Sequence, residues 1–263
     1  MKTFLSIVVL LACIPVVAAY ETVRFDAFDG IDITADVYWA DKDDPQTPFI
    51  VLLHQAGYSR GEYLEIAPKL VAMGYNCMAV DLRSGSGVRT VINETAREAV
   101  EARQSPTYLD AITDILDAIY YVRDHYARGD LILWGSSYSA SLALKMAADR
   151  PRLVQGVIAF SPGEYFNQLG KPNNWIAESS RTLEMPVFIA SAHHEERLWG
   201  HIYQGIYSED RVAYIPERGG VHGSRALWAE SPDHEGYWQA VTVFLKRYFP
   251  VDESGEESAS PSK

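Results

Sequence analysis

Three polar residues in the second half of the sequence have the types needed to attack a carbonyl group. Ser137 lies between Gly135 and Ser139 in the pattern Gly-x-Ser-x-Ser. Glu195 and His222 follow it in that order. A histidine that takes a serine's proton makes the hydroxyl nucleophilic, and a carboxylate orients that histidine. We therefore predict Ser137 as nucleophile, His222 as general base and Glu195 as orienting acid, although helix capping would explain the pentapeptide alone equally well.

The residues around Ser137 predict a turn that exposes its hydroxyl. An apolar strand, Leu131 to Trp134, runs into the small residues of the pentapeptide, and a helical pattern follows. This order is typical of a nucleophile elbow, whose usual form is Gly-x-Ser-x-Gly. Small residues are needed because the turn is tight, and Ser139 meets this need less well than glycine.

Two backbone N–H groups are expected to form an oxyanion hole for the tetrahedral intermediate. One belongs to Tyr138, which directly follows Ser137. The other belongs to Ala56, because the apolar strand Phe49 to Leu53 ends in His-Gln-Ala-Gly, a place that usually supplies the second donor. His54 is expected to bond loop backbone rather than act as a base.

Two later strands deliver the acid and the base. Glu195 comes shortly after an apolar strand, Val187 to Ala190, and its offset from that strand favours it over Glu196. His222 lies in a glycine-flanked loop after the strand Val212 to Ile215. The adjacent histidines before Glu195 lack a matched set of partners, so we predict no metal site.

The elements that must position these residues alternate along the chain. Thr22 to Phe28 and Ile31 to Trp39 alternate apolar and polar residues around Asp29-Gly30, which predicts an antiparallel hairpin. Six continuous apolar runs predict strands buried on both faces: Phe49–Leu53, Cys77–Val80, Leu131–Trp134, Val157–Phe160, Val187–Ala190 and Val212–Ile215. Helical spacing covers Tyr63–Met73, Leu109–Tyr126, Ala140–Ala148, Leu198–Tyr207 and Tyr237–Tyr248. We predict an α/β fold with a mostly parallel, eight-stranded, doubly wound sheet and an N-terminal antiparallel hairpin.

Residues 20–250 are expected to form a single domain, followed by a disordered acidic tail at 251–263. Within the domain, residues 163–181 break the strand-helix rhythm with aromatic residues among Gly, Pro and Asn. This segment is a candidate lid, and its shortness predicts an open site without a separate cap domain.

Residues 1–19 carry one positive charge, an apolar stretch and small residues before a cleavage point after Ala19, the pattern of a secretory signal peptide. Export to the periplasm or the medium is therefore expected. An alternative is a lipoprotein anchored through Cys13, in Leu-Leu-Ala-Cys, and only this alternative would attach the protein to a membrane. Beyond the leader Cys77 is the remaining cysteine, so no intrachain disulfide is expected in the mature chain.

The formal net charge of −12 disfavours binding to nucleic acid, because phosphates would be repelled. No cofactor is required by a serine, a histidine and a carboxylate acting together. The predicted partner is therefore a small-molecule ester, and the oligomeric state stays open.

Nearly the whole mature chain resembles the α/β-hydrolase superfamily. The resemblance rests on the elbow, the strand-end motifs and a loop that begins with Asp81 and is similar to that superfamily's Asp-x-Arg-x-x-Gly loop. It looks most like dienelactone-hydrolase-like members and small serine esterases without a large cap. Ser139 in place of Gly and Glu195 in place of the commoner Asp depart from the pattern. Dienelactone hydrolases use a cysteine nucleophile, so Ser137 favours a general esterase.

These observations together predict a serine hydrolase that cleaves carboxylic esters of small or medium acyl groups through a Ser-His-Glu triad and an acyl-enzyme. The alternatives are a peptidase or thioesterase on the same triad, or a catalytically inactive binding module of the same fold.

Overall fold

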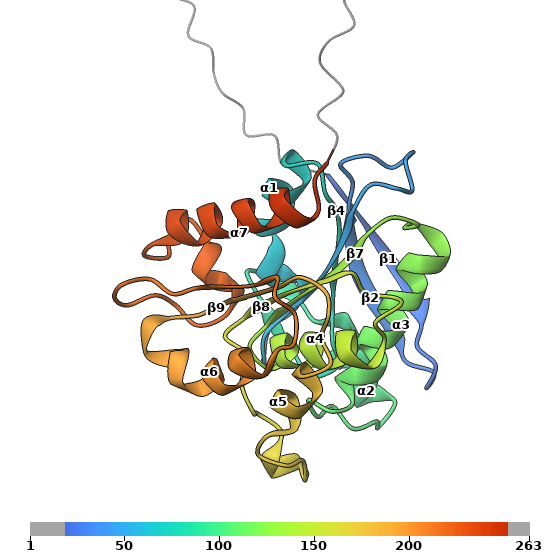
Figure 1. Ribbon diagram of the computed structural model, residues 1–263. Coiled ribbons are helices and arrows are strands. Elements are labelled where there is room, and N and C mark those ends of the chain that lie inside the picture. The colour runs from blue at the N-terminus through green and yellow to red at the C-terminus, as the bar shows by residue number, and fades with distance from the viewer. Residues whose placement is uncertain (1–18, 252–263) are drawn as a thin grey trace, which may run out of the picture.

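The computed structural model describes residues 19–251 (Figure 1). The predicted signal peptide at 1–19, the lipidation candidate Cys13 and the predicted tail at 251–263 lie outside the described residues, apart from Ala19 and Val251. Within the described chain, no helix is both long enough and apolar enough to cross a membrane.

Eight strands form one sheet in the order β1-β2-β4-β3-β7-β8-β9-β10. The first strand pairs antiparallel with the second and the second with β4, whereas the other neighbours are parallel. Their bounds are β1 Tyr20–Asp26, β2 Asp32–Tyr38, β3 Phe49–Leu53, β4 Asn76–Val80, β7 Leu131–Ser136, β8 Gly156–Phe160, β9 Val187–Ala190 and β10 Arg211–Tyr214. A separate ribbon joins β5 (Gly87–Val88) to β6 (Val91–Ile92). The predicted α/β fold class is confirmed.

Helices cover both faces of the sheet (Figure 1). Their bounds are α1 Ile66–Ala72, α2 Glu94–Glu101, α3 Ala111–His125, α4 Tyr138–Asp149, α5 Trp175–Ser180, α6 Glu196–Gly205 and α7 His234–Tyr248. Alternate residues of β3 point to opposite faces, as a pleated strand requires. Val51 packs in a core with α3, α4, α5 and α6, and Leu52 packs in a second core with α1 and α7. Burial on both faces explains why the central strands read as unbroken apolar runs.

The predicted helix at Tyr63–Met73 is interrupted in the structure. A 3-10 helix covers Arg60–Tyr63, and α1 begins only at Ile66. Pro68 explains the delayed start, because proline lacks an N–H group and is tolerated only in the first turn of a helix. Helical spacing alone does not separate the two pieces, because their apolar residues share one spacing.

The segment predicted as a lid is exposed at residues 167–170 and 172–174 and buried at Ile176 and Ala177. It contains a 3-10 helix at Asn167–Leu169 and the short helix α5. The Glu164 carboxylate accepts hydrogen bonds from the backbone N–H groups of Ile176 and Ala177, both at 2.9 Å, at the start of α5. Both of these residues are buried in the core that includes α4. The segment is therefore anchored at its α5 end.

Candidate active site

Ser137 lies on a strained turn between β7 and α4. Its φ and ψ angles are +62° and −120°, a conformation that L-residues rarely adopt. At Gly135 an added Cβ would lie 2.4 Å from both the Ala140 Cα atom and the Ser139 carbonyl oxygen. The turn therefore requires glycine at this position, as a nucleophile elbow does.

Ser139 replaces the second glycine of the usual elbow and gains hydrogen bonds by doing so. Its Oγ atom accepts the N–H of Ser136 at 2.9 Å and lies 2.8 Å from the carbonyl oxygen of Leu53. The side chain thus ties the elbow to the end of β3. The sequence pattern indicates that Ser139 fits less well than glycine, whereas in the structure its hydroxyl is buried and fully engaged.

The structure brings the three predicted triad residues together. The Nε2 atom of His222 lies 2.8 Å from Oγ of Ser137, and its Nδ1 atom lies 2.5 Å from Oε1 of Glu195. Glu195 ends a 3-10 helix after β9, and His222 follows β10. With Nδ1 protonated, Nε2 is free to accept the serine proton, so the geometry has the order that base catalysis requires.

Glu195 is held in place by partners other than His222. Its Oε2 atom accepts hydrogen bonds from Oγ of Ser161 at 2.7 Å and from the N–H of Ala192 at 3.2 Å. Burial alone would raise the pKa of Glu195, but the hydrogen bonds from His222 and Ser161 outweigh it and lower the pKa. The carboxylate therefore stays ionised beside the imidazole.

Glu196, the alternative acid, points away from this arrangement. It is exposed, and its side chain makes no hydrogen bond or ion pair within residues 19–251. The neighbouring His193 bonds the carbonyl oxygen of Pro216 through Nδ1, at 3.2 Å. The described chain holds no group of three or more His, Cys, Asp or Glu side chains that could bind a metal ion.

The two predicted oxyanion donors occupy the expected turns. Tyr138 is the first residue of α4, so its N–H has no partner inside the helix. The N–H of Ala56, after β3, bonds no acceptor within the described chain. Both groups are thus available to a ligand.

His54 is a structural residue in this fold. It is fully buried, its Nδ1 atom lies 2.8 Å from the carbonyl oxygen of Gln55, and its Nε2 atom accepts the N–H of Leu82 at 2.9 Å. Burial lowers its pKa to about 4, although these backbone hydrogen bonds oppose the change. The ring is therefore neutral near pH 7, in agreement with the sequence interpretation.

Tyr165 in the lid segment also reaches the site, which the sequence did not indicate. Its hydroxyl donates to the carbonyl oxygen of Ser161 at 2.8 Å and lies near Ser137. Across from it, the ring of Tyr108 stacks on Tyr138 with 4.4 Å between centroids. Between these segments lies a pocket of about 250 Å³, lined by Pro106, Thr107, Tyr108, Tyr165, Gln168 and Leu169.

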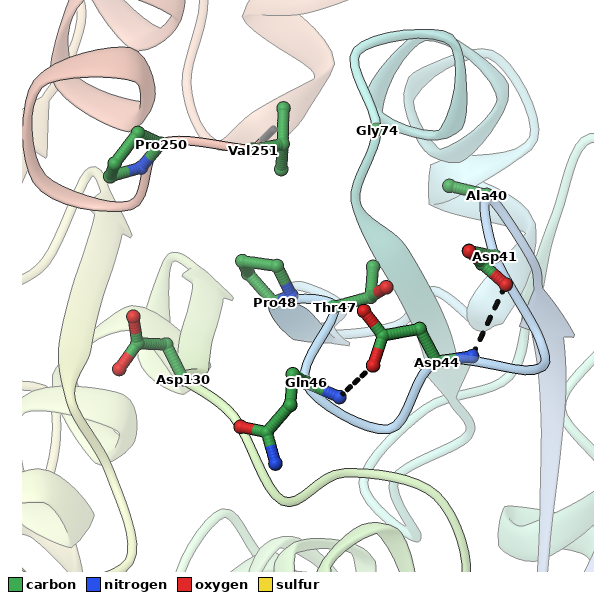
Figure 2. Close-up of a pocket in the computed structure, with 10 residues that line it drawn as sticks. All are labelled: Ala40, Asp41, Asp44, Gln46, Thr47, Pro48, Gly74, Asp130, Pro250 and Val251. Atoms are coloured by element: carbon green, nitrogen blue, oxygen red, sulfur yellow. Dashed lines mark hydrogen bonds between the residues drawn. The ribbon is translucent and has the colours of Figure 1, made fainter. Parts of the chain in front are cut away.

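A larger cavity, of about 590 Å³, lies at the opposite edge of the sheet (Figure 2). Its lining residues Pro48 and Asp130 precede β3 and β7, whereas Ser137 follows β7. The carboxylates of Asp41 and Asp44 accept backbone N–H groups of their own loop, as the dashed lines in Figure 2 show. No serine, cysteine or histidine lines this cavity, so we assign no chemistry to it.

Solved structures with the same fold are numerous. The esterase Pf2001 of Pyrococcus furiosus has a TM-score of 0.65 at 16% identity, over 88% of this chain and 93% of its own. A dienelactone hydrolase of Anabaena variabilis has a TM-score of 0.65 at 14% identity, over 88% and 98%. Est1E of Butyrivibrio proteoclasticus, solved with ferulic acid bound, has a TM-score of 0.67 at 13% identity, over 86% and 98%. At such identities the likeness shows the fold.

A comparison with curated proteins finds no significant match. The family model for serine aminopeptidase S33 matches residues 44–195, which is more than half of the chain. Ser137 and Glu195 lie inside the matched region, and His222 lies beyond it. The resemblance to the α/β-hydrolase superfamily is confirmed, and the chain belongs to the serine aminopeptidase S33 family of α/β hydrolases.

Proposed function

We propose that this protein is a serine hydrolase that cleaves carboxylic esters of small or medium acyl groups. The hydrogen-bonded series from Ser137 through His222 to Glu195 carries the proposal. A serine can act as nucleophile, a histidine as base and a glutamate as orienting acid. The three residues follow different strands of one sheet. Such an arrangement is used for acyl transfer in unrelated folds.

In the proposed reaction Oγ of Ser137 attacks the ester carbonyl while Nε2 of His222 takes its proton. The N–H groups of Tyr138 and Ala56 would stabilise the resulting oxyanion, by about 3 kcal/mol each. His222 then gives the proton to the departing alcohol, and an acyl-enzyme remains. A water molecule, activated by His222, attacks the acyl carbon, and collapse of the second intermediate releases the acid and restores Ser137.

The pocket that Tyr108 and Tyr165 line supports the limit on acyl size. Its volume of about 250 Å³ is below the range of about 300–1,000 Å³ of pockets that enclose drug-sized ligands. Two tyrosines and Leu169 line it, so a short apolar acyl group fits its chemistry. A long acyl chain would extend past Leu169 into solvent.

The family match favours a second candidate, a peptidase, because the matching model describes an aminopeptidase. An aminopeptidase must hold the α-ammonium group of its substrate, which calls for a carboxylate near the nucleophile. The six residues that line the pocket between Tyr108 and Tyr165 include no carboxylate. This difference favours the ester as substrate.

A fluorophosphonate probe tests the proposal. We expect it to label the wild-type protein and not the Ser137→Ala variant. The adduct must be located by fragmentation, since the tryptic peptide 129–145 also holds Ser136, Ser139 and Ser141. No labelling of Ser137 in the folded wild type would contradict the proposal and favour a binding module.

The substrate class is tested by steady-state kinetics with p-nitrophenyl acetate, butyrate and octanoate, beside an aminoacyl p-nitroanilide. We expect kcat/KM to be highest for acetate or butyrate. A preference for octanoate would contradict the acyl-size limit, and comparable turnover of the anilide would favour the peptidase.

We also propose that the protein is exported, with cleavage after Ala19. Mass spectrometry of the mature N-terminus after expression with the full leader tests this. A chain that begins at Tyr20 is expected, and a lipidated Cys13 would establish the alternative.

A further inference from the structure

Glu62 is a buried carboxylate beside the candidate site that the triad does not use. It lies in the 3-10 helix Arg60–Tyr63, after β3, and none of its surface is exposed. Burial raises its pKa to about 7, although hydrogen bonds from Gln55 and Ser136 oppose the change. Within the described chain, no basic side chain forms an ion pair with it. Burial of an acid without an ion pair costs folding free energy, which points to a role for Glu62 in the site.

The two oxygens of Glu62 bond two different loops of the site. Oε2 accepts the backbone N–H of Gln55 at 2.7 Å, and Oε1 accepts the hydroxyl of Ser136 at 2.7 Å. The Oγ atom of Ser136 in turn accepts the N–H of Ser224 at 2.8 Å. One carboxylate therefore connects the loop after β3, the nucleophile elbow and the loop that carries His222.

Each bonded group lies within two positions of a residue of the proposed machinery. Gln55 precedes Ala56, whose N–H is the second oxyanion donor in the proposed reaction. Ser136 precedes Ser137, and Ser224 follows His222 by two positions. Loss of any one of these hydrogen bonds would therefore displace a catalytic group without a change in the packing of the core.

We propose that Glu62 is a positioning residue. It fixes the position of the Ala56 N–H, the second oxyanion donor, relative to the nucleophile elbow and the loop that carries His222. The inference rests on the proposed hydrolase function. When it is ionised, a carboxylate suits this task because both of its oxygens accept hydrogen bonds and both neighbours donate. A glutamine amide has one acceptor oxygen and an NH2 group that only donates, so it can satisfy Gln55 but must donate to Ser136.

The test compares Glu62→Ala and Glu62→Gln with Asp117→Asn as a matched control. Asp117, on α3, also accepts a backbone N–H, that of Phe28 at 2.8 Å, but lies outside the site. We expect kcat for p-nitrophenyl butyrate to fall about 100-fold in Glu62→Ala and about 10-fold in Glu62→Gln, with KM within twofold, because an oxyanion donor acts on the transition state. In Asp117→Asn kcat should be unchanged.

Rates are expressed per folded protein, measured by circular dichroism, so that a purely structural role would leave kcat unchanged. Wild-type kcat in the folded fraction of both Glu62 variants would overturn the proposal. If Glu62→Ala does not fold, Glu62→Gln, which keeps the volume, decides the question on the same criterion.

Hydrogen exchange separates this proposal from the proposed function. We expect faster exchange of amides 54–58 in Glu62→Ala, which removes the acceptor of the Gln55 N–H, than in wild type, and no change there in Asp117→Asn. If wild type hydrolyses no ester and resists the probe, the proposed function fails, and the exchange result still decides whether Glu62 holds this loop. Unchanged exchange would overturn the positioning role.

Discussion

His222 bonds Glu195 and not Glu196, although the two carboxylates are neighbours in sequence. Nδ1 of His222 lies 2.5 Å from Oε1 of Glu195, whereas Glu196 begins α6 with an exposed side chain. One position along the chain thus separates a buried acid from a solvated one. The difference arises because Glu195 ends the 3-10 helix that directs its side chain inward, onto Ser161 and His222.

This pair gives the first prediction. Glu195→Gln should lower kcat about 10³- to 10⁴-fold, because an amide neither fixes the tautomer of His222 nor stabilises its protonated form. Glu196→Gln, which removes the adjacent charge, should keep kcat within twofold. Ester hydrolysis by the two variants checks this, and equal loss in both would contradict the assignment of the acid.

The second prediction concerns Ser161, which supports the acid. Its hydroxyl donates to Oε2 of Glu195 and accepts the N–H of Gly223 at 2.9 Å. Ser161→Gly should lower the free energy of unfolding by about 1–3 kcal/mol, since both partners are left unsatisfied, and should lower kcat about 10-fold. Glycine is the variant of choice because φ is +54° at this position, so the backbone itself is not strained by the change. Urea unfolding and kinetics measure the two effects, and wild-type values for both would show that Ser161 does not support the acid.

The residues at strand ends are predictable from the sequence. Ser137, Glu195 and His222 each follow an apolar run, and the carboxyl ends of parallel strands share one edge of a sheet. Periodicity marks those runs, so the order of the elements along the chain is enough to place the three side chains on one edge.

The supporting residues could not be found in this way. Ser161 bonds a side chain 34 positions away and Glu62 one 74 positions away, and no local pattern encodes such pairs. Tyr165 lies in the irregular lid segment, where neither helical nor strand spacing predicts the direction of a side chain. These contacts depend on how loops pack over the sheet edge, which only the folded chain determines.

The third prediction concerns Ser139, where the elbow departs from its usual pattern. Ser139→Gly restores Gly-x-Ser-x-Gly but removes the bonds to the N–H of Ser136 and the carbonyl oxygen of Leu53. We expect the free energy of unfolding to fall by about 1–3 kcal/mol, with no gain in kcat. A more stable or faster Ser139→Gly variant in urea unfolding and kinetics would show that the glycine is better here.

The fourth prediction concerns the pocket wall. Tyr165→Ala enlarges the pocket that Tyr165 and Tyr108 line, so the ratio of kcat/KM for octanoate over butyrate should rise about 10-fold. Tyr165→Phe keeps the ring and removes the hydroxyl that bonds Ser161. It should lower kcat/KM for all esters severalfold and leave their ratio unchanged. An unchanged ratio in Tyr165→Ala would place the acyl group elsewhere.

The fifth prediction concerns the buried charge of Glu62 and the pH dependence of stability. Its pKa in the folded protein, about 7, lies above its ordinary value of 4.5. Between these pH values the folded state holds a proton that the unfolded state has lost, so raising the pH favours unfolding. The stabilising contribution is present below pH 4.5 and is lost as the pH rises through 7, by about 3 kcal/mol in total.

Glu62→Gln cannot lose this proton, so the variant should gain stability relative to wild type as the pH rises. Urea unfolding at pH 4.5, 6 and 7.5 measures the difference. The exposed-carboxylate variant Glu196→Gln is the control and should follow the wild-type curve, because its exposed side chain makes no hydrogen bond or ion pair within residues 19–251. A constant difference between Glu62→Gln and wild type across this range would show that folding does not raise the pKa of Glu62, and that its hydrogen bonds to Gln55 and Ser136 offset its burial in full.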